Sequence, residues 1–517
     1  MRPHLLYADR DFQAGDAAAA SWPADLVSDL RIDVLLDVMA AGDQHGREFA
    51  QAVLLAGLSA PDEVTYRQDV LTDCLRHPDA VAALHRVAAS ACQDAGRQQA
   101  GPPGSAGESL RQSLLMLATL CPALRELGAV AADQAGQFRS AGFSRLTSLL
   151  TDQLTDSGLT RVAELLTTLR FRNGIRVTAG LGHSNKGTGY VLQNRSSGQR
   201  AGRPAWLPGR ARGGRAPVAA GRAEELVLDV PERDVSARQA LGALRNRALG
   251  PVASVLAATC DRLRDFLELL RLETGFYLGC ARLHQALTAR GVPLCLPEPA
   301  ALDRHILTAA ELRDPVLVLT SGNPGTIAGN DLDATDRSLI LITGASQGGK
   351  STLLRSIGLA QLMLQAGLFT CARSFTGSVR GRLATHFARA EDAAMISGKL
   401  DEELARLSIL TDEITPGCIL LCNDSFASTT EREGAHIGRA VTTAFADSGV
   451  LVVFATHLHE LARCLHDERP AGTLVLRAGR TDDGRRTYRF AAGPPVPASY
   501  AADTFREVFG NQTAAIR

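Results

Sequence analysis

Lysine is nearly missing from this sequence, which contains three lysines against fifty-two arginines. Such a preference indicates a coding bias, so a high arginine content is by itself weak evidence for a nucleic-acid surface. The formal net charge at pH 7 is zero. Any charged partner must therefore be recognised by a local patch and not by the field of the whole protein.

Long apolar runs and closely paired cysteines are also missing. No stretch approaches 18 uninterrupted apolar residues, and the N-terminus, MRPHLLYADRDFQ, lacks the pattern of a signal peptide. The ten cysteines are scattered without C-x-x-C spacing, which argues against a zinc site and fits a reducing compartment. We therefore expect a cytoplasmic protein without a membrane span, and 517 residues are enough for about two to four domains.

The most informative segment is 338–352, SLILITGASQGGKST. An apolar run leads into a loop of the form G-x-x-x-x-G-K-S, and an amphipathic stretch, 352–365, follows. Strand, glycine-rich loop and helix are the context in which this motif binds nucleoside triphosphates. The alternative, an incidental glycine-rich turn, leaves unexplained why one of only three lysines stands where the motif requires it. We expect Lys350 to reach the β- and γ-phosphates and Ser351 to bind Mg²⁺. The loop residues predicted to bind nucleotide are Gly344, Ala345, Ser346, Gln347, Gly348, Gly349, Lys350, Ser351 and Thr352.

Three further motifs follow in the order used by ATPases of the ABC superfamily. Ser397 and Gly398 open a predicted helix, whose N-terminus is suited to cap the γ-phosphate of a nucleotide held by a second subunit. Because Ser-Gly is also common before helices, this motif carries little weight alone. The segment CILLCND, 418–424, is typical of a buried strand. It ends in Asn423 and Asp424, where the Mg²⁺ ligands and the water-activating carboxylate are expected.

The last motif is VLVVFATHLHEL, 450–461. Its strand delivers His457 to the carboxyl edge of the sheet, where α/β proteins bind ligands. There His457 is suited to contact the γ-phosphate or to orient the attacking water, although a lone histidine after a strand is more often structural. The motifs together predict Lys350, Asp424 and His457 as catalytic residues, and Ser351, Asn423 and Asp424 as the metal site.

The rest of the chain shows two other patterns. Helical periodicity dominates 25–170, and a long helix interrupted at Gly250–Pro251 is expected from about 236 to 289. Between them lies a basic insert, 171–222, with ten Lys or Arg, no Asp or Glu, and short β-like pieces. From about residue 315 the apolar runs VLVLT, SLILITG, CILLC and VLVVFATH alternate with helices, which predicts a mostly parallel sheet.

The predicted fold is an α/β P-loop ATPase domain of the ABC type, preceded by a mainly α-helical core and lever domain with a small β insert. The predicted domains are a first helical arm at 1–170, the basic β insert at 171–230, a returning helical arm at 231–312 and the ATPase domain at 313–517.

The basic insert is a candidate surface for nucleic acid. Its charges would neutralise several phosphates if one face presented them. A flexible, solvated Arg/Gly loop is the alternative, and the arginine bias favours it. Nothing in the insert resembles a base-reading helix, so contact is expected with the DNA backbone and not with a particular sequence. The residues predicted to contact DNA are Lys186, Arg195, Arg200, Arg203, Arg210, Arg212 and Arg215.

At these motifs the chain resembles the MutS family of DNA mismatch-repair ATPases. Its loop, 344–352, matches the family form G-P-N-M-G-G-K-S-T, and THLHEL at 456–461 matches T-H-x-x-E-L. RDPV at 313–316 is similar to the family's R-H-P element, and Asn330–Asp331 to the N-D that precedes its phosphate loop. The resemblance implies ATP and Mg²⁺ as cofactors, Asn330 as the adenine contact, and a homodimer in which Ser397 completes the partner's site. It further implies that the helical arms and the basic insert form a lever and a clamp on DNA.

Three departures from the family qualify this resemblance. The chain has no room for the family's mismatch-recognition and connector domains, and its one nearby F-x-E, 266–268, lies in a predicted helix as packing. The family's D-E is Asn423–Asp424 here, with Thr429–Thr430 fixing the register, so slow hydrolysis is expected. The family's G-R-G is Phe426-Ala427-Ser428.

The leading hypothesis is thus a shortened MutS-type ATPase that clamps duplex or structured DNA, in mismatch repair or related DNA maintenance. The alternative is a non-hydrolysing, nucleotide-gated scaffold for DNA or protein. The ATPase subunit of a membrane transporter is a poorer third reading, because the segment around Ser397 lacks the L-S-G-G-Q form and the helical half has no counterpart there.

Overall fold

The structure of the protein, a computed structural model, describes residues 1–12, 23–98, 103–169, 177–181, 187–192, 235–344, 347–389, 398–469, 471–481 and 485–495. The chain forms two compact units. The first unit contains Met1 with 87–129 and 152–268, and the second contains 2–86, 130–151 and 269–517.

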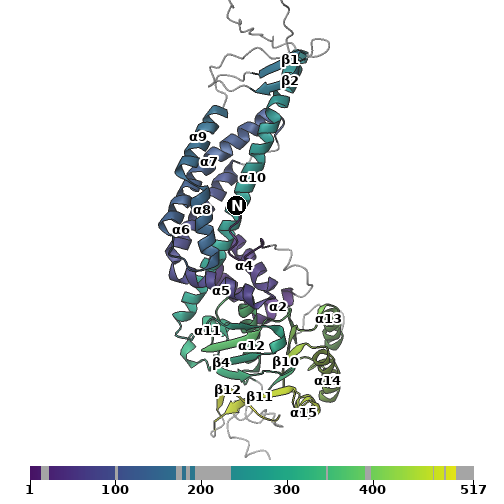
Figure 1. The fold of residues 1–517 in the computed structure, drawn as a ribbon. Helices are drawn as coiled ribbons and strands as arrows, with labels where there is room; N and C mark the ends of the chain where they lie inside the picture. Colours follow the sequence, from purple (N-terminus) through teal and green to yellow (C-terminus); the bar gives the residue numbers. More distant parts are fainter. Residues whose placement is uncertain are drawn as a thin grey trace, which may run out of the picture. The chain divides into compact units, whose positions relative to one another are not determined.

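The first unit is built from helices. It contains α9 (Asp156–Leu169) and large parts of α6 (Pro78–Arg97), α7 (Ala106–Asp133) and α10 (Val235–Thr288). In Figure 1, α7, α9 and α10 run side by side. Leucines at helical spacing form the apolar face of α7. The buried ones are Leu110, Leu114, Leu117, Leu120, Leu124 and Leu127. The predicted helical character of this region is confirmed.

By length and composition, α7 is also the one helix in the described part of the chain that is long and apolar enough to cross a membrane, with a mean hydropathy of 1.5 over its most apolar stretch. The core helix of a soluble protein passes the same test. One such helix is therefore weak evidence for a span.

The basic insert begins and ends outside the described residues, but its β character is confirmed. Strand β1 (Val177–Leu181) pairs antiparallel with β2 (Gly187–Leu192). All seven residues predicted to contact DNA lie outside the described ranges.

The long helix differs from expectation at its proline. The predicted interruption at Gly250–Pro251 is wrong, because α10 continues through Pro251 as one helix of 54 residues. A proline removes one helical hydrogen bond, and the buried side chains of Leu249 and Ala253 on either side supply packing that offsets the loss. Further along, Phe266 and Leu267 are fully buried, which confirms that the F-x-E segment is packing.

The second unit begins with an irregular segment that is hydrogen-bonded into a helical core. The amide of Leu5 donates to Glu273 Oε2 at 2.8 Å, and Tyr277 Oη donates to the Leu5 carbonyl at 2.7 Å. Arg67 Nε donates to the Leu6 carbonyl at 2.9 Å. The helices of this unit before the sheets include α2 (Pro23–Leu30), α3 (Ile32–Ala40), α4 (Gln44–Ala56), α5 (Pro61–Arg76) and most of α8 (Ala141–Gln153).

The buried Glu273 makes the stability of this core depend on pH. Burial raises the pKa of Glu273 to about 7, from 4.5 for an ordinary glutamic acid. Between these pH values the unfolded chain releases a proton that the folded chain keeps, so the contribution of Glu273 to stability is most favourable below pH 4.5 and falls as pH rises toward 7. We expect Glu273→Gln, which keeps an acceptor for Leu5, to raise the thermal unfolding midpoint at pH 8 and to change it little at pH 4.5. An equal shift at both pH values would contradict this cause; the exposed Glu48→Gln is the control.

The C-terminal part of the second unit is organised around a six-stranded sheet of order β12-β11-β6-β10-β9-β8. Five strands are parallel, and only β12 is antiparallel to its neighbour. This confirms the predicted mostly parallel sheet. The strands are β6 (Leu339–Thr343), β8 (Leu383–Phe387), β9 (Ile419–Asn423), β10 (Leu451–Thr456), β11 (Thr473–Arg480) and β12 (Arg486–Ala492).

A second sheet has the order β3-β7-β4-β5. Its strands are β3 (Glu298–Ala300), β4 (Leu307–Leu312), β5 (Asn330–Asp333) and β7 (Ser374–Ser378), and short 3₁₀ turns occupy Leu302–Arg304 and Pro324–Thr326. The prediction of a strand at VLVLT is wrong, because these residues form α11 (Pro315–Thr320). Asp314 caps this helix and Pro315 occupies its first position, and both favour a helix start.

Helix α12 (Lys350–Gln365) is the buried centre of this unit. The prediction of an amphipathic helix is wrong, because thirteen of its sixteen residues are buried. The sheets cover part of α12, and α2, α4 and α11 contact the rest. Three further helices lie together on one flank of the sheet in Figure 1: α13 (Lys399–Glu413), α14 (Glu431–Asp447) and α15 (His459–Glu468).

Candidate nucleotide-binding site

The glycine-rich loop connects β6 to α12 at the carboxyl edge of the sheet. Gly344 and Gly349 have φ values of 143° and 92°, in the region that favours glycine. A Cβ at Gly344 would lie 2.6 Å from the Cβ of Ala478, so a side chain does not fit there. Gly349 precedes the first residue of α12, which points the positive end of the helix at the loop. Ala345 and Ser346 lie outside the described residues.

Lys350 lies folded back over this loop. Its Nζ donates to the Gly344 carbonyl at 3.1 Å. Burial lowers the pKa of Lys350 from 10.5, while the charge of Asp424 opposes the shift. A desolvated ammonium group at the N-terminus of a helix is suited to an anion with several oxygens.

The predicted metal-binding residues lie next to one another. Ser351 Oγ donates to Asn423 Oδ1 at 2.8 Å, which brings the start of α12 to the end of β9. Asp424 follows directly in the chain. Mg²⁺ prefers oxygen ligands and usually takes only one or two from the protein, with phosphate and water completing the set. The hydroxyl, amide and carboxylate oxygens here fit that chemistry.

Asp424 and His457 form a pair at the ends of neighbouring strands. Their Nδ1 and Oδ1 atoms are 2.9 Å apart. The hydrogen bond to Asp424 is the main cause that raises the pKa of His457, and partial burial opposes it. The amide of Asp424 donates to the Ala455 carbonyl at 2.8 Å, which fixes the backbone of Asp424 to β10. The carboxylate therefore has a defined place near the loop.

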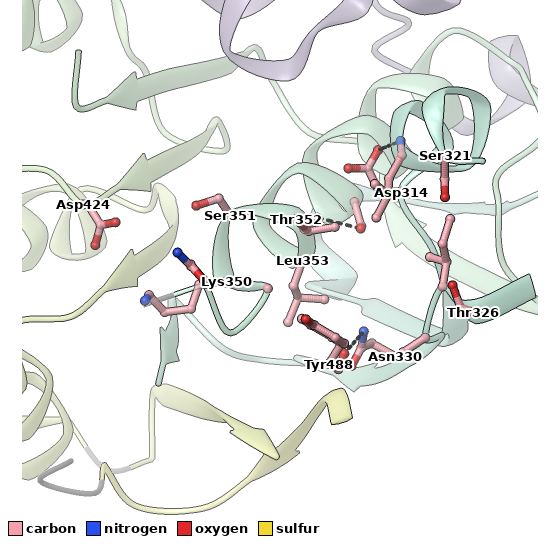
Figure 2. A pocket seen from close by; sticks show the side chains of 16 residues that line it. Asp314, Ser321, Thr326, Asn330, Lys350, Ser351, Thr352, Leu353, Asp424 and Tyr488 are labelled. Atoms are coloured by element: carbon pink, nitrogen blue, oxygen red, sulfur yellow. Dashed lines mark hydrogen bonds between the residues drawn. The ribbon is translucent and has the colours of Figure 1, made fainter. Parts of the chain in front are cut away.

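A cavity of about 490 Å³ joins these groups to a second set of side chains. Figure 2 shows Lys350, Ser351 and Asp424 at one end and Thr326, Asn330 and Tyr488 toward the other. The lining residues among those predicted are Gln347, Gly349, Lys350, Ser351, Thr352, Asn330 and Asp424. The structure thus brings most of the described predicted residues into one site, with His457 attached through Asp424. Ser397 lies outside the described residues, directly before Gly398, the N-terminal cap of α13.

Asn330 has a structural contact that the sequence did not indicate. Its Nδ2 donates to the Tyr488 carbonyl at 3.2 Å, and its Oδ1 accepts from the Phe490 amide at 2.8 Å. The side chain thereby joins β5 to β12. It also lines the cavity, so its role as a base contact stays a prediction.

Sequence reasoning missed Tyr488 and Asp314. Tyr488 lines the cavity, is 48% exposed, and adopts a φ of 55°. A Cβ at Gly349 would lie 3.4 Å from Tyr488 Cδ1, so the ring stands close to the loop. No local signal pointed to it, because its position depends on how β12 pairs with β11. Asp314 was noticed only as part of RDPV, and its cap position was the available signal.

A mostly parallel sheet with a glycine-rich loop between its central strand and a buried helix defines a P-loop nucleotide-binding domain. A model of the MutS2 N-terminal domain matches residues 59–290, and a model of MutS domain V, a P-loop ATPase domain, matches residues 340–491. The chain belongs to the MutS family.

Individual proteins that are similar to the chain are MutS proteins as well. The DNA mismatch repair protein MutS of Chloroflexus aurantiacus is 29% identical over 231 residues, which are 44% of this chain and 24% of that protein. MutS of Desulfosudis oleivorans is 33% identical over 179 residues, or 33% of this chain and 20% of that protein. The DNA mismatch repair protein MutS 2 of Halobacterium salinarum is 29% identical over 197 residues, which are 38% of this chain and 22% of that protein. The matched part of the chain spans less than a quarter of the length of these relatives.

Proposed function

We propose that this protein is a MutS-type ATPase that binds ATP with Mg²⁺ and couples the nucleotide to DNA. The carrying observation is that Lys350, Ser351 and Asp424 line one cavity of about 490 Å³. That volume lies within the range of small-molecule sites, which is roughly 300–1,000 Å³. Asn423 and His457 contact this set directly.

Each residue has a defined part in the proposed reaction. Lys350 and the loop amides hold the phosphates, and Ser351 with Asn423 holds Mg²⁺, which when bound neutralises phosphate charge. Asp424 accepts a proton from the attacking water. His457, held by Asp424, stabilises charge at the γ-phosphate or orients that water. Because Asp is one methylene shorter than Glu and Asn423 is neutral, hydrolysis should be slow.

We further propose that two copies act together as an ATP-dependent clamp. Ser397, before the N-terminus of α13, would contact the nucleotide of a second copy. The basic insert would contact the DNA backbone without reading its sequence. The family membership and the charge of residues 171–222 support this proposal. A cytoplasmic location belongs to the same proposal.

One observation favours a second candidate, a nucleotide-gated scaffold without useful turnover. Asn423 occupies a metal-site position and offers a single neutral oxygen, which already accepts a hydrogen bond from Ser351. A weaker Mg²⁺ site leaves nucleotide binding possible and slows the chemistry.

The proposal predicts the behaviour of a Lys350→Ala variant. We expect this variant to lose ATP binding and ATP hydrolysis, because Lys350 is the one lysine among the residues that line the cavity. The measurement is ATP binding by calorimetry and phosphate release with and without duplex or branched DNA. The surface variant Arg463→Ala, which also removes one positive charge, is the control.

The outcomes separate the two candidates. DNA-stimulated hydrolysis that Lys350→Ala abolishes supports the ATPase. ATP binding with no turnover on any DNA leaves the scaffold. Unchanged ATP affinity in Lys350→Ala would show that this cavity is not the ATP-binding site.

A further inference from the structure

The loop that carries Asp424 contains two residues with an unusual backbone conformation. It runs from the end of β9 to the start of α14, and both Asp424 and Phe426 have positive φ values, 49° and 64°. Asp adopts this region more readily than most residues, but Phe426 is bulky, and such a residue persists there only where surrounding structure fixes it. Contacts outside the loop must therefore stabilise this conformation.

Glu403 of α13 supplies the first of these contacts. Its side chain is buried, at 5% exposure. Its Oε2 accepts from the Phe426 amide at 3.2 Å and from Ser428 Oγ at 3.0 Å. One carboxylate oxygen thus holds two points of the loop, on either side of Ala427.

His386 of β8 supplies the second contact. His386 and Ser425 are both fully buried. His386 Nδ1 lies 2.8 Å from Ser425 Oγ, and Nε2 lies 3.1 Å from the Glu403 carbonyl. Ser425 Oγ also lies 2.7 Å from the His386 carbonyl. The imidazole therefore bridges α13 to the residue that follows Asp424.

The chemistry of these contacts limits how they are arranged. Burial lowers the pKa of His386 to about 4, so the ring is neutral at pH 7 and carries one proton. The Glu403 carbonyl can only accept, which favours this proton on Nε2. The Ser425 hydroxyl has a single hydrogen, which it donates to the His386 carbonyl at 2.7 Å. An apolar side chain at position 386 or 425 therefore leaves a buried polar atom without its partner.

We propose that Glu403, His386 and Ser425 are positioning residues that hold Asp424 in place for ATP hydrolysis. This inference rests on the proposed function. None of the three lines the nucleotide cavity. They act on the side of the loop that faces α13 and β8, while Asp424 faces Lys350 and His457 on the other side. Their effect should accordingly fall on turnover and not on nucleotide affinity.

The expected loss of kcat follows from the geometry of the loop. A misplacement of about 1 Å at a reacting group can lower a rate by roughly 10²-fold. Asp424 has less reach than Glu, so the conformation of the loop backbone strongly affects how near its carboxylate comes to the water. Loss of the Glu403 or the Ser425 contact should lower kcat by about 10- to 100-fold.

The test compares Glu403→Ala, Glu403→Gln and Ser425→Ala with the surface variant Ser408→Ala, which lies on the exposed side of α13. For each variant we would measure kcat for ATP hydrolysis on DNA, the Kd for a non-hydrolysed ATP analogue, and amide hydrogen exchange over 419–430. We expect Glu403→Ala and Ser425→Ala to lower kcat, keep Kd, and speed exchange in this loop. Glu403→Gln keeps an acceptor oxygen and should retain most of the turnover.

Three results would overturn the inference. Variants with normal kcat would show that Asp424 needs no such support. A parallel loss of kcat, affinity and thermal stability would mark a purely structural role. Failure of the Gln variant to rescue turnover would exclude the hydrogen bonds as the cause. Absence of hydrolysis in the unaltered protein is a separate outcome, because it removes the proposed ATPase function and the positioning role along with it.

Discussion

Replacing Asp424 with Asn is expected to lower ATP hydrolysis by about 10²- to 10⁴-fold, the usual contribution of a general base. The amide cannot accept the proton of the attacking water, although it keeps the size of the side chain. The hydrogen bond that orients His457 also changes, because Nδ1 now faces a neutral group 2.9 Å away instead of a carboxylate. ATP binding should persist, since Lys350 and the loop amides remain. Phosphate release and the Kd for ATP, measured on the same preparation, check this expectation.

Asp424→Glu is the informative companion variant. A large gain in kcat would indicate that the shorter carboxylate limits the reaction. No gain would place the limit elsewhere, at Asn423 for example. An Asp424→Asn protein that hydrolyses ATP at the normal rate would refute the assigned role of Asp424.

The P-loop half was predictable because its site residues lie in short segments of the sequence. A strand, a glycine-rich loop and a helix are contiguous, so residues 338–352 fix their own geometry. Asp424 and His457 follow the ends of two strands, and parallel neighbours in a sheet bring such ends together. The structure places Asp424 Oδ1 and His457 Nδ1 2.9 Å apart, in agreement with this argument.

Other features depend on contacts between distant segments and left no local trace. Tyr488 reaches the cavity because β12 turns back along β11, and the Glu403 contacts to Phe426 and Ser428 need α13 to lie against the loop. Helix α12 looked amphipathic because its few polar residues suggested an exposed face. Two of them, Gln361 and Gln365, are instead buried and hydrogen-bonded to each other at 2.7 Å.

The sequence contains a signal for the helix at 316–320, where the apolar pattern predicts a strand. A short apolar run fits a buried strand and a buried helix equally well. The two residues before it decide the case, because Asp314 is a preferred N-cap and Pro315 a preferred first helical residue. The apolar pattern alone predicts a strand, whereas Asp314 and Pro315 predict the helix that is observed.

Asp314 leads to the second large expected effect, on stability. Its side chain has no exposed surface, and its Oδ1 accepts from the amides of Val316 and Leu317 at 2.9 and 3.2 Å. Its Oδ2 accepts from Arg355 Nε at 2.6 Å, which ties α11 to the second turn of α12. Removing one partner of a buried ion pair typically costs about 3–5 kcal/mol, because the other charge stays buried and unpaired. We expect Asp314→Ala to lower the free energy of unfolding of this unit by that amount in chemical denaturation.

The paired charge, and not the helix cap, should dominate this loss. Asp314→Asn retains an oxygen for the two amides and removes the charge, so it should lose nearly as much stability as Asp314→Ala. A double variant, Asp314→Ala with Arg355→Met, removes both charges and should be less destabilised than the sum of the two single changes. An additive double variant would show that the two side chains act independently. Because Arg355 lies on the helix that begins with Lys350 and Ser351, non-additivity should also appear in the affinity for ATP, which would make this pair a support of the phosphate loop as well as of the fold.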